Sequence, residues 1–165
     1  MEMSQQQPPP AQSGSLNELV GDPDALRVRS TVPCDIQRAW DFVTVPGWFV
    51  NDGALRDHVL TTPEPGRHHV QDPVHGEFLF EDLDVVPPTQ YVFRGSHTGG
   101  ETQAPATIVT FSLRELTPPD RGTEIVITET GFAGLGLDAE ASRAAVDENV
   151  RAWVLELKLA ADALR

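Results

Sequence analysis

The C-terminal segment, residues 138–165, limits the possible fold more than any other part of the chain. Its apolar residues recur at spacings of three and four, which is the period of an amphipathic helix. They are Val146, Val150, Trp153, Leu157, Ala160 or Ala161, and Leu164. Asp138 is suited to cap this helix, because its carboxylate can accept hydrogen bonds from the free N–H groups of the first turn. A helix of this length needs a large partner surface for its apolar stripe.

The middle of the chain is expected to provide that surface as a sheet. Pro and Gly residues divide the sequence from 54 to 131 into short runs rich in β-branched and aromatic residues, which is typical of strands joined by turns. Together with an alternating run at 26–32, they predict about seven strands. The expected strands are residues 26–32, 56–61, 67–71, 74–86, 90–97, 106–116 and 123–130. Short connections make them antiparallel, so we predict an α+β domain with a curved sheet around the C-terminal helix.

The remaining segments complete the predicted organisation. Apolar residues between 36 and 43 share one side of a helix, and the apolar stretch 47–49 is expected to form a second short helix or a tight loop. Residues 1–24 are rich in Gln, Pro, Ser and Gly, which is typical of a disordered tail. The domain is therefore expected to span residues 25–165, and a chain of 165 residues suits one such domain.

The charge of the chain narrows the classes of partner. Twenty-five acidic residues against twelve basic ones give a net charge of −13, which opposes binding to the phosphates of nucleic acids. No apolar stretch approaches the length of a membrane span, and the first residues do not resemble a signal peptide. A single cysteine, Cys34, excludes an internal disulfide. We expect a soluble, cytoplasmic protein, either monomeric or weakly dimeric, that binds neither nucleic acid nor membrane.

Several short motifs occur in a fixed order along the chain. They include VPCDIQRAW at 32–40, PGR at 65–67, GE at 76–77, VVPP at 85–88, YVFR at 91–94, VTFSL at 109–113, GTEIVITETGF at 122–132 and NVRAW at 149–153. With the order of elements, these motifs resemble the helix-grip fold of the START and SRPBCC superfamily. They are most similar to the branch named after the activator of heat-shock-protein-90 ATPase, and the resemblance covers residues 26–164. One departure is Gly95, where that family typically carries a tryptophan.

The resemblance implies a cavity between the C-terminal helix and the concave face of the sheet, with no bound cofactor. It suits a hydrophobic or polyketide-like small molecule. The residues expected to line it are Trp48, Phe49, Glu81, Tyr91, Phe93, Gly95, His97, Phe111, Glu129, Asn149 and Trp153. The alternative for each aromatic residue is ordinary core packing. Because the indole is missing at position 95, we expect an enclosed pocket there that Gly95→Trp would fill. If the strand tolerates the new side chain, this variant should keep or gain stability and lose affinity for the ligand.

Two sets of polar residues invite a chemical interpretation. Glu81 and Glu129 fall on apolar strand faces by alternation, where they could act as an acid and a base or accept hydrogen bonds at the cavity mouth. The histidines and the aspartate of the 58–75 region could suggest a metal site; they are His58, His68, His69, Asp72 and His75. Adjacent strand residues point to opposite faces and no metal-binding spacing is present, so we expect no metal. Cys34 at a helix start is expected to be structural rather than a nucleophile.

Three functions remain open from the sequence. The leading one is binding of a hydrophobic metabolite. The second is a cyclase- or aromatase-like enzyme that would use Glu81, Glu129, Tyr91 or His97 for proton transfer. The third is a protein that sequesters a natural product for self-resistance, or a cochaperone-like interaction domain. A cavity in the structure would favour the first two, and a large exposed apolar patch the third.

Overall fold

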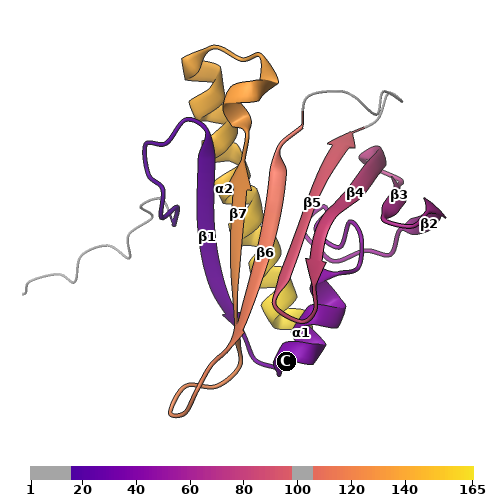
Figure 1. The fold of residues 1–165 in the computed structure, drawn as a ribbon, viewed down its shortest axis with the longest axis vertical. Helices are drawn as coiled ribbons and strands as arrows, with labels where there is room; N and C mark the ends of the chain where they lie inside the picture. Colours follow the sequence, from indigo (N-terminus) through magenta and orange to yellow (C-terminus); the bar gives the residue numbers. More distant parts are fainter. Residues whose placement is uncertain (1–15, 98–105) are drawn as a thin grey trace, which may run out of the picture.

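The computed structural model describes residues 16–97 and 106–165 and confirms the α+β prediction (Figure 1). Seven strands form one antiparallel sheet in the order β1-β7-β6-β5-β4-β3-β2. The strands are β1 (Ala25–Val32), β2 (Val59–Glu64), β3 (Arg67–Asp72), β4 (Gly76–Val86), β5 (Gln90–His97), β6 (Ile108–Glu115) and β7 (Thr123–Thr130). Apart from the pairing of β1 with β7, strands adjacent in the sheet are also adjacent in the sequence, as the short connections predict.

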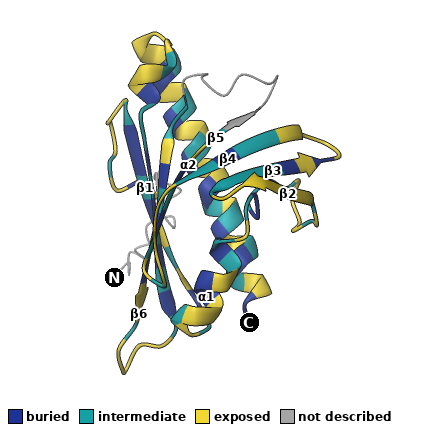
Figure 2. Ribbon diagram, turned by 45° about the vertical axis from the view of Figure 1, so that its right-hand side comes forward, coloured by how far each residue is buried: buried dark blue, intermediate teal, exposed yellow. Residues whose placement is uncertain are grey.

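The long C-terminal helix α2 (Ala139–Ala163) lies across one face of the sheet, as Figure 1 shows. The carboxylate of Asp138 caps it, accepting a hydrogen bond from the N–H of Ala141 at 2.7 Å. The expected apolar stripe is the buried side of the helix, and its members Val146, Val150, Trp153, Leu157 and Ala160 are all buried. In Figure 2 buried residues recur along α2 and along the strands that it covers. Neither helix of the described residues is long and apolar enough to cross a membrane.

Helix α1 (Ile36–Val43) closes one end of the sheet and buries Ala39, Trp40 and Val43. The second short helix considered for residues 47–49 is not formed, and residues 46–49 are turns. Gly47 has φ +73°, a left-handed backbone that ends any helical continuation from α1. A short 3₁₀ helix, η1 (Phe132–Leu135), instead precedes α2.

Residues 16–24, which the composition assigns to the tail, lie against the domain. Asn17 is buried, and its side-chain oxygen accepts hydrogen bonds from the backbone N–H groups of Leu19 and Arg27. The carbonyl oxygen of Pro23 accepts one from the hydroxyl of Ser142 in α2. These polar contacts, rather than apolar burial, hold the segment, so composition alone did not indicate it. The rest of the predicted tail, residues 1–15, lies outside the described residues.

Strand β4 contains an irregularity that changes which side chains face the helix. Asp82 pairs with Phe93 and Asp84 with Val92, so Leu83 is an extra residue without a partner in the register. This is a β-bulge, in which two residues oppose one on the neighbouring strand. The alternation of side chains therefore reverses at Leu83. Even-numbered residues before it and odd-numbered ones after it share the concave face of the sheet.

Candidate ligand-binding cavity

A cavity of about 580 Å³ lies between α2 and the concave face of the sheet. Strands β4 to β7, helix α2 and the loop between α1 and β2 (residues 44–58, the α1–β2 loop) contribute to its wall. The lining residues are Phe49, Val50, Asn51, His75, Phe78, Phe80, Phe93, Gly95, Thr107, Val109, Glu129, Glu148, Asn149, Ala152, Trp153 and Glu156. Because His75, Glu148 and Ala152 are exposed, the cavity opens to solvent beside them and is not the enclosed pocket that the sequence predicts.

Aromatic rings form the apolar part of this wall. Phe49 from the α1–β2 loop stacks on Phe93 of β5 with ring centroids 5.7 Å apart, and lies 4.9 Å from Trp153 of α2. On the next strand, Phe78 and Phe80 stack on each other at 5.9 Å. Such ring pairs stabilise one another beyond simple burial. The aromatic wall is therefore built from four separate segments that hold each other in place.

Glu129 of β7 places a carboxylate at the bottom of the cavity. Glu129 is only 5% exposed. Its carboxylate accepts hydrogen bonds from Trp153 Nε1 at 2.8 Å, from the Thr107 hydroxyl and from Asn149 Nδ2 at 3.4 Å. Burial raises the pKa of Glu129, and the three hydrogen bonds only partly oppose that effect. All three donors are neutral, so the carboxylate is buried with hydrogen bonds but without a positive partner.

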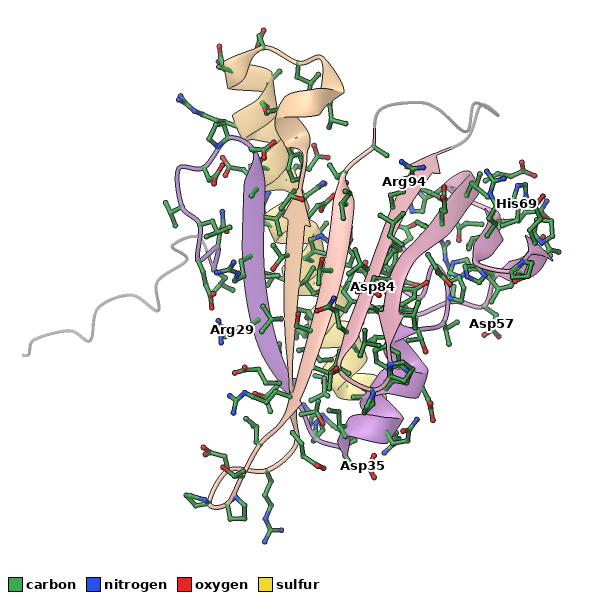
Figure 3. The ribbon with its side chains drawn as sticks, in the orientation of Figure 1. Arg29, Asp35, Asp57, His69, Asp84 and Arg94 are labelled. Atoms are coloured by element: carbon green, nitrogen blue, oxygen red, sulfur yellow. The ribbon has the colours of Figure 1, made fainter. Side chains whose placement is uncertain are left out.

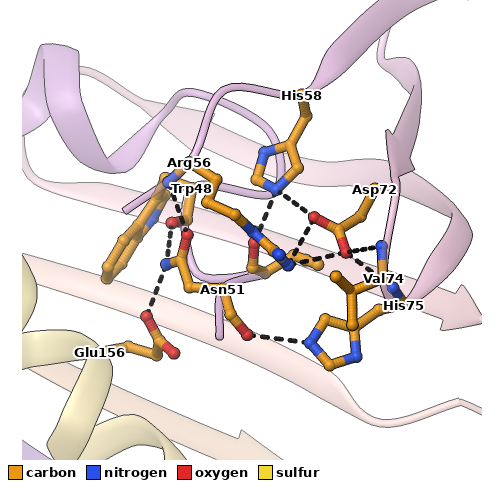
Figure 4. A network of polar contacts seen from close by, with 9 residues as sticks. Trp48, Asn51, Arg56, His58, Asp72, Val74, His75 and Glu156 are labelled. Carbon is orange, nitrogen blue, oxygen red and sulfur yellow. Dashed lines mark hydrogen bonds and ion pairs between the residues drawn. The ribbon is translucent and has the colours of Figure 1, made fainter. Parts of the chain in front are cut away.

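Glu156 of α2 places a second carboxylate on the cavity wall. Its Oε2 accepts a hydrogen bond from Asn51 Nδ2 at 2.7 Å (Figure 4). The same side-chain amide of Asn51 donates to the backbone carbonyl of Trp48 at 2.8 Å. His75 Nε2 lies 3.0 Å from the backbone carbonyl oxygen of Asn51. Burial raises the pKa of Glu156, which the Asn51 hydrogen bond and the charge of His75 lower in part. Asn51 thus connects the α1–β2 loop to α2 across the cavity edge.

Asp72 of β3 holds the other side of the α1–β2 loop. Its buried carboxylate accepts from Arg56 Nη2 at 2.8 Å and from the backbone N–H groups of Val74 and His75 at 3.0 and 2.7 Å. His58 Nε2 lies 3.1 Å from it and 2.6 Å from the Val50 carbonyl oxygen. Figure 4 shows these groups converging on Asp72. Among the described residues no group of three or more His, Cys, Asp or Glu side chains is placed to hold a metal ion.

Of the residues predicted to line the cavity, the structure brings six together on its wall. They are Phe49, Phe93, Gly95, Glu129, Asn149 and Trp153. Trp48 and Phe111 are buried behind it, with ring centroids 6.5 and 5.7 Å from that of Trp153. The side chain of His97 lies outside the described residues.

Tyr91 lies in a different place, on a second cavity of about 360 Å³ near α1. Its hydroxyl donates to the carboxylate of Asp82, and His68 Nε2 lies 3.1 Å from the other oxygen of that carboxylate. Burial, followed by the hydrogen bond to the Asp82 carboxylate and its charge, raises the pKa of Tyr91. Of the residues proposed for proton transfer in a cyclase-like enzyme, Tyr91 and Glu129 therefore line different cavities.

The predicted inward position of Glu81 is wrong. Glu81 pairs with Arg94 across β4 and β5, and its Oε2 lies 3.1 Å from Arg94 Nη2. Arg94, which Figure 3 labels on β5, is exposed, and Glu81 is partly exposed. Alternation counted back from Val85 places Glu81 inside, but the bulge at Leu83 reverses the count. The structure consequently separates Glu81 from Glu129, and the two do not form an acid–base pair.

Gly95 does not leave the space that the missing indole suggested. Phe80 pairs with it across the strands and its ring lies directly over the glycine. A Cβ atom at position 95 would come within 2.3 Å of Phe80 Cδ1 and 2.4 Å of Cε1. The aromatic ring of β4 has taken the place of a side chain on β5, so the condition on which Gly95→Trp was expected to keep stability, a strand that tolerates the side chain, is not met unless Phe80 moves.

We expect Gly95→Ala to lower the unfolding free energy by about 1–3 kcal/mol, because the added methyl group displaces the Phe80 ring from its packed position. Chemical denaturation monitored by circular dichroism measures this loss. Gly134→Ala is the matched control, since a Cβ atom there meets nothing within 4 Å. Equal stability of the two variants would contradict the close contact between Gly95 and Phe80.

Glu129→Gln tests the buried carboxylate through pH. Because the folded-state pKa of Glu129 lies above the ordinary value of 4.5, this group favours folding most below that value. Its contribution is lost as pH rises through the folded-state pKa. We therefore expect wild type to lose stability relative to Glu129→Gln as the pH rises above 4.5. A constant difference between the two proteins over this range, measured by urea denaturation, would show that burial does not disfavour the charge.

Comparison with known proteins adds to the fold but supplies no family. No family model matches the sequence, and no curated protein matches it. Solved structures are similar: protein MLL2253 of Mesorhizobium loti has a TM-score of 0.60 at 19% identity, covering 84% of this chain and 94% of that one. A Rhizobium leguminosarum protein reaches 0.57 at 23%, covering 85% and 93%. DynU16, from the dynemicin biosynthetic locus, reaches 0.58 at 20%, covering 86% of this chain and 47% of that one. At these identities the likeness shows a shared fold.

Proposed function

We propose that the protein binds a hydrophobic, polyketide-like small molecule in the cavity between α2 and the sheet. The observation that carries the proposal is the combination of a continuous aromatic wall with a few converging polar groups, which is typical of small-molecule sites. Its volume of about 580 Å³ falls within the range of such sites. The aromatic rings of Phe49, Phe80 and Phe93 would contact the body of the ligand. Glu129 and Asn149 would bind its polar end.

Two further observations support this choice of ligand class. The sequence motifs resemble the SRPBCC superfamily, whose cavity lies at the same place in the fold. DynU16, with the same fold, comes from a biosynthetic locus for a natural product. The second carboxylate that a two-residue cyclase mechanism would use, Glu81, lies on the other face of the sheet. Binding is therefore the function that the described geometry supports best.

The experiment is titration with the uncharged fluorescent probe N-phenyl-1-naphthylamine. We expect saturable binding to wild type and at least tenfold weaker binding to Ala152→Trp, because Ala152 is an exposed position on the cavity wall where an indole would occupy the space. Leu155→Trp is the matched control, since Leu155 is 62% exposed on the same helix but does not line the cavity. No binding to wild type, or equal binding to both variants, would contradict the proposal.

A further inference from the structure

Apart from His75, the ionisable side chains on the cavity wall are all acidic. Three glutamates line it, Glu129, Glu148 and Glu156, and no Lys or Arg does. Every one of the twelve Lys and Arg residues of the chain falls within residues 16–97 and 106–165, so the segments that are not described contain none. Among the described residues, none of the three glutamates forms an ion pair with Lys or Arg. His75 is the sole lining residue that can carry a positive charge.

Without a ligand, the charged form of the buried Glu129 carboxylate is destabilised, because no positive group lies beside it. A buried carboxylate is stable as an anion when a positive group compensates the water it has lost. At Glu129 the compensation comes from three neutral donors on Thr107, Asn149 and Trp153. A positively charged group that enters the cavity would supply the compensating charge that these neutral donors lack. A negative group would meet three carboxylates and be repelled.

The aromatic wall is suited to the same kind of group. Faces of Trp and Phe rings attract cations through their quadrupole, and the attraction is larger when the cation is shielded from water. Trp153 places an aromatic ring and a carboxylate next to each other: its Nε1–H donates a hydrogen bond to Glu129, and its indole ring lines the cavity. Phe49 lies against that indole at 4.9 Å. An alkylammonium group beside Trp153 would thus contact a ring face and lie near a carboxylate.

From these observations we infer that the cavity selects an organic cation: a hydrophobic, aromatic or polycyclic molecule that carries an amine or quaternary ammonium group next to Glu129. The inference rests on the proposed function, because it presupposes that the cavity binds a hydrophobic ligand, and it adds the charge of that ligand. Glu156 and Glu148 extend the preference toward the mouth. A neutral molecule of the same size would be bound through apolar contacts alone. An anionic one would make the same apolar contacts but would be repelled by the three glutamates, so it should bind most weakly.

Three naphthalene probes of nearly equal size but different charge test this selection. They are 2-naphthylmethylammonium, 2-naphthylmethanol and 2-naphthoate, each titrated by displacement of N-phenyl-1-naphthylamine. We expect the cation to bind at least tenfold more tightly than the alcohol, and the carboxylate to bind most weakly. In Glu129→Gln the ratio of the cation and alcohol affinities should fall about tenfold, because the counter-charge is gone while the amide keeps the shape of the side chain.

Glu140→Gln is the matched control for the overall negative charge of the protein. Glu140 is an exposed residue in the first turn of α2 and does not line the cavity, so the same ratio should be unchanged. Equal affinity of cation and alcohol in a protein that binds the naphthylamine would overturn the inference and leave the proposed function standing. An equal fall of the ratio in Glu129→Gln and Glu140→Gln would also overturn it. Failure of every probe, the naphthylamine included, would instead contradict the proposed function.

Discussion

Trp153→Ala is expected to lower the unfolding free energy by about 3–5 kcal/mol, the range for removing a large aromatic side chain from a core. The indole is 6% exposed and packs against Phe49 and Phe111 with ring centroids 4.9 and 5.7 Å away. Its removal would merge the space of the side chain with the cavity and take a hydrogen-bond donor from Glu129. Urea denaturation followed by circular dichroism measures the loss directly.

Trp153→Phe separates the contribution of aromatic packing from that of the hydrogen bond to Glu129. It keeps a ring in the core but removes the N–H group, so the expected loss is smaller, about 1.5–3 kcal/mol for a hydrogen bond to a charged group. If Trp153→Ala were close to wild type in stability and failed to bind N-phenyl-1-naphthylamine, the residue would be part of the binding wall without anchoring α2. If it changed neither property, the orientation of α2 would be wrong.

Asp72→Ala is expected to lower the melting temperature by on the order of 10 °C, because removing one partner of a buried ionic network leaves the other charge uncompensated. Arg56 would lose its carboxylate partner, and the N–H groups of Val74 and His75 would lose their acceptor. The α1–β2 loop carries Phe49 and Asn51, so probe affinity should fall as well. Asp57→Ala, at an exposed position of the same loop, is the control and should leave both properties unchanged.

The same network gives a pH dependence opposite in sign to that of Glu129. Burial alone would raise the pKa of Asp72, but the backbone hydrogen bonds from His75 and Val74 and the charges of Arg56 and His58 lower it below its ordinary value of 3.8. A carboxyl group with a lowered folded-state pKa stabilises the fold above its unfolded value and loses that contribution as pH falls through the folded one. Wild type should therefore lose stability in acid more steeply than Asp72→Ala, as thermal unfolding at decreasing pH will show.

Regular periodicity accounts for the parts of the structure that the sequence predicted correctly. The stripe that includes Val146, Val150 and Leu157 identified α2 and its buried face, because a helix repeats every 3.6 residues wherever it lies. Alternation placed Glu129 on the inner face of β7 together with Ile125 and Ile127. These elements have no interruption, so each position follows from its neighbours.

The parts that were missed depend on contacts between segments or on interruptions of the period. Asn51 lies in an irregular loop, where no period assigns a direction to its side chain, and only the folded chain brings it to Glu156. Glu156 itself could have been found, since it follows Trp153 by three residues on the same side of α2. Gly95 was misinterpreted because its space is filled from the neighbouring strand by Phe80.

The extra residue in β4 also bears on how this protein can change in evolution or in the laboratory. Before Leu83 the strand gives Phe78 and Phe80 to the larger cavity, and after it Val85 contributes to the smaller one. Point substitutions can therefore reshape either cavity separately. Deletion of Leu83 would remove the bulge and leave every other residue of β4 with its present partner on β5 and on its present face of the sheet. Shortening β4 by one residue at the bulge would thus change the local twist of the strand between the two cavities, and not which residues line them.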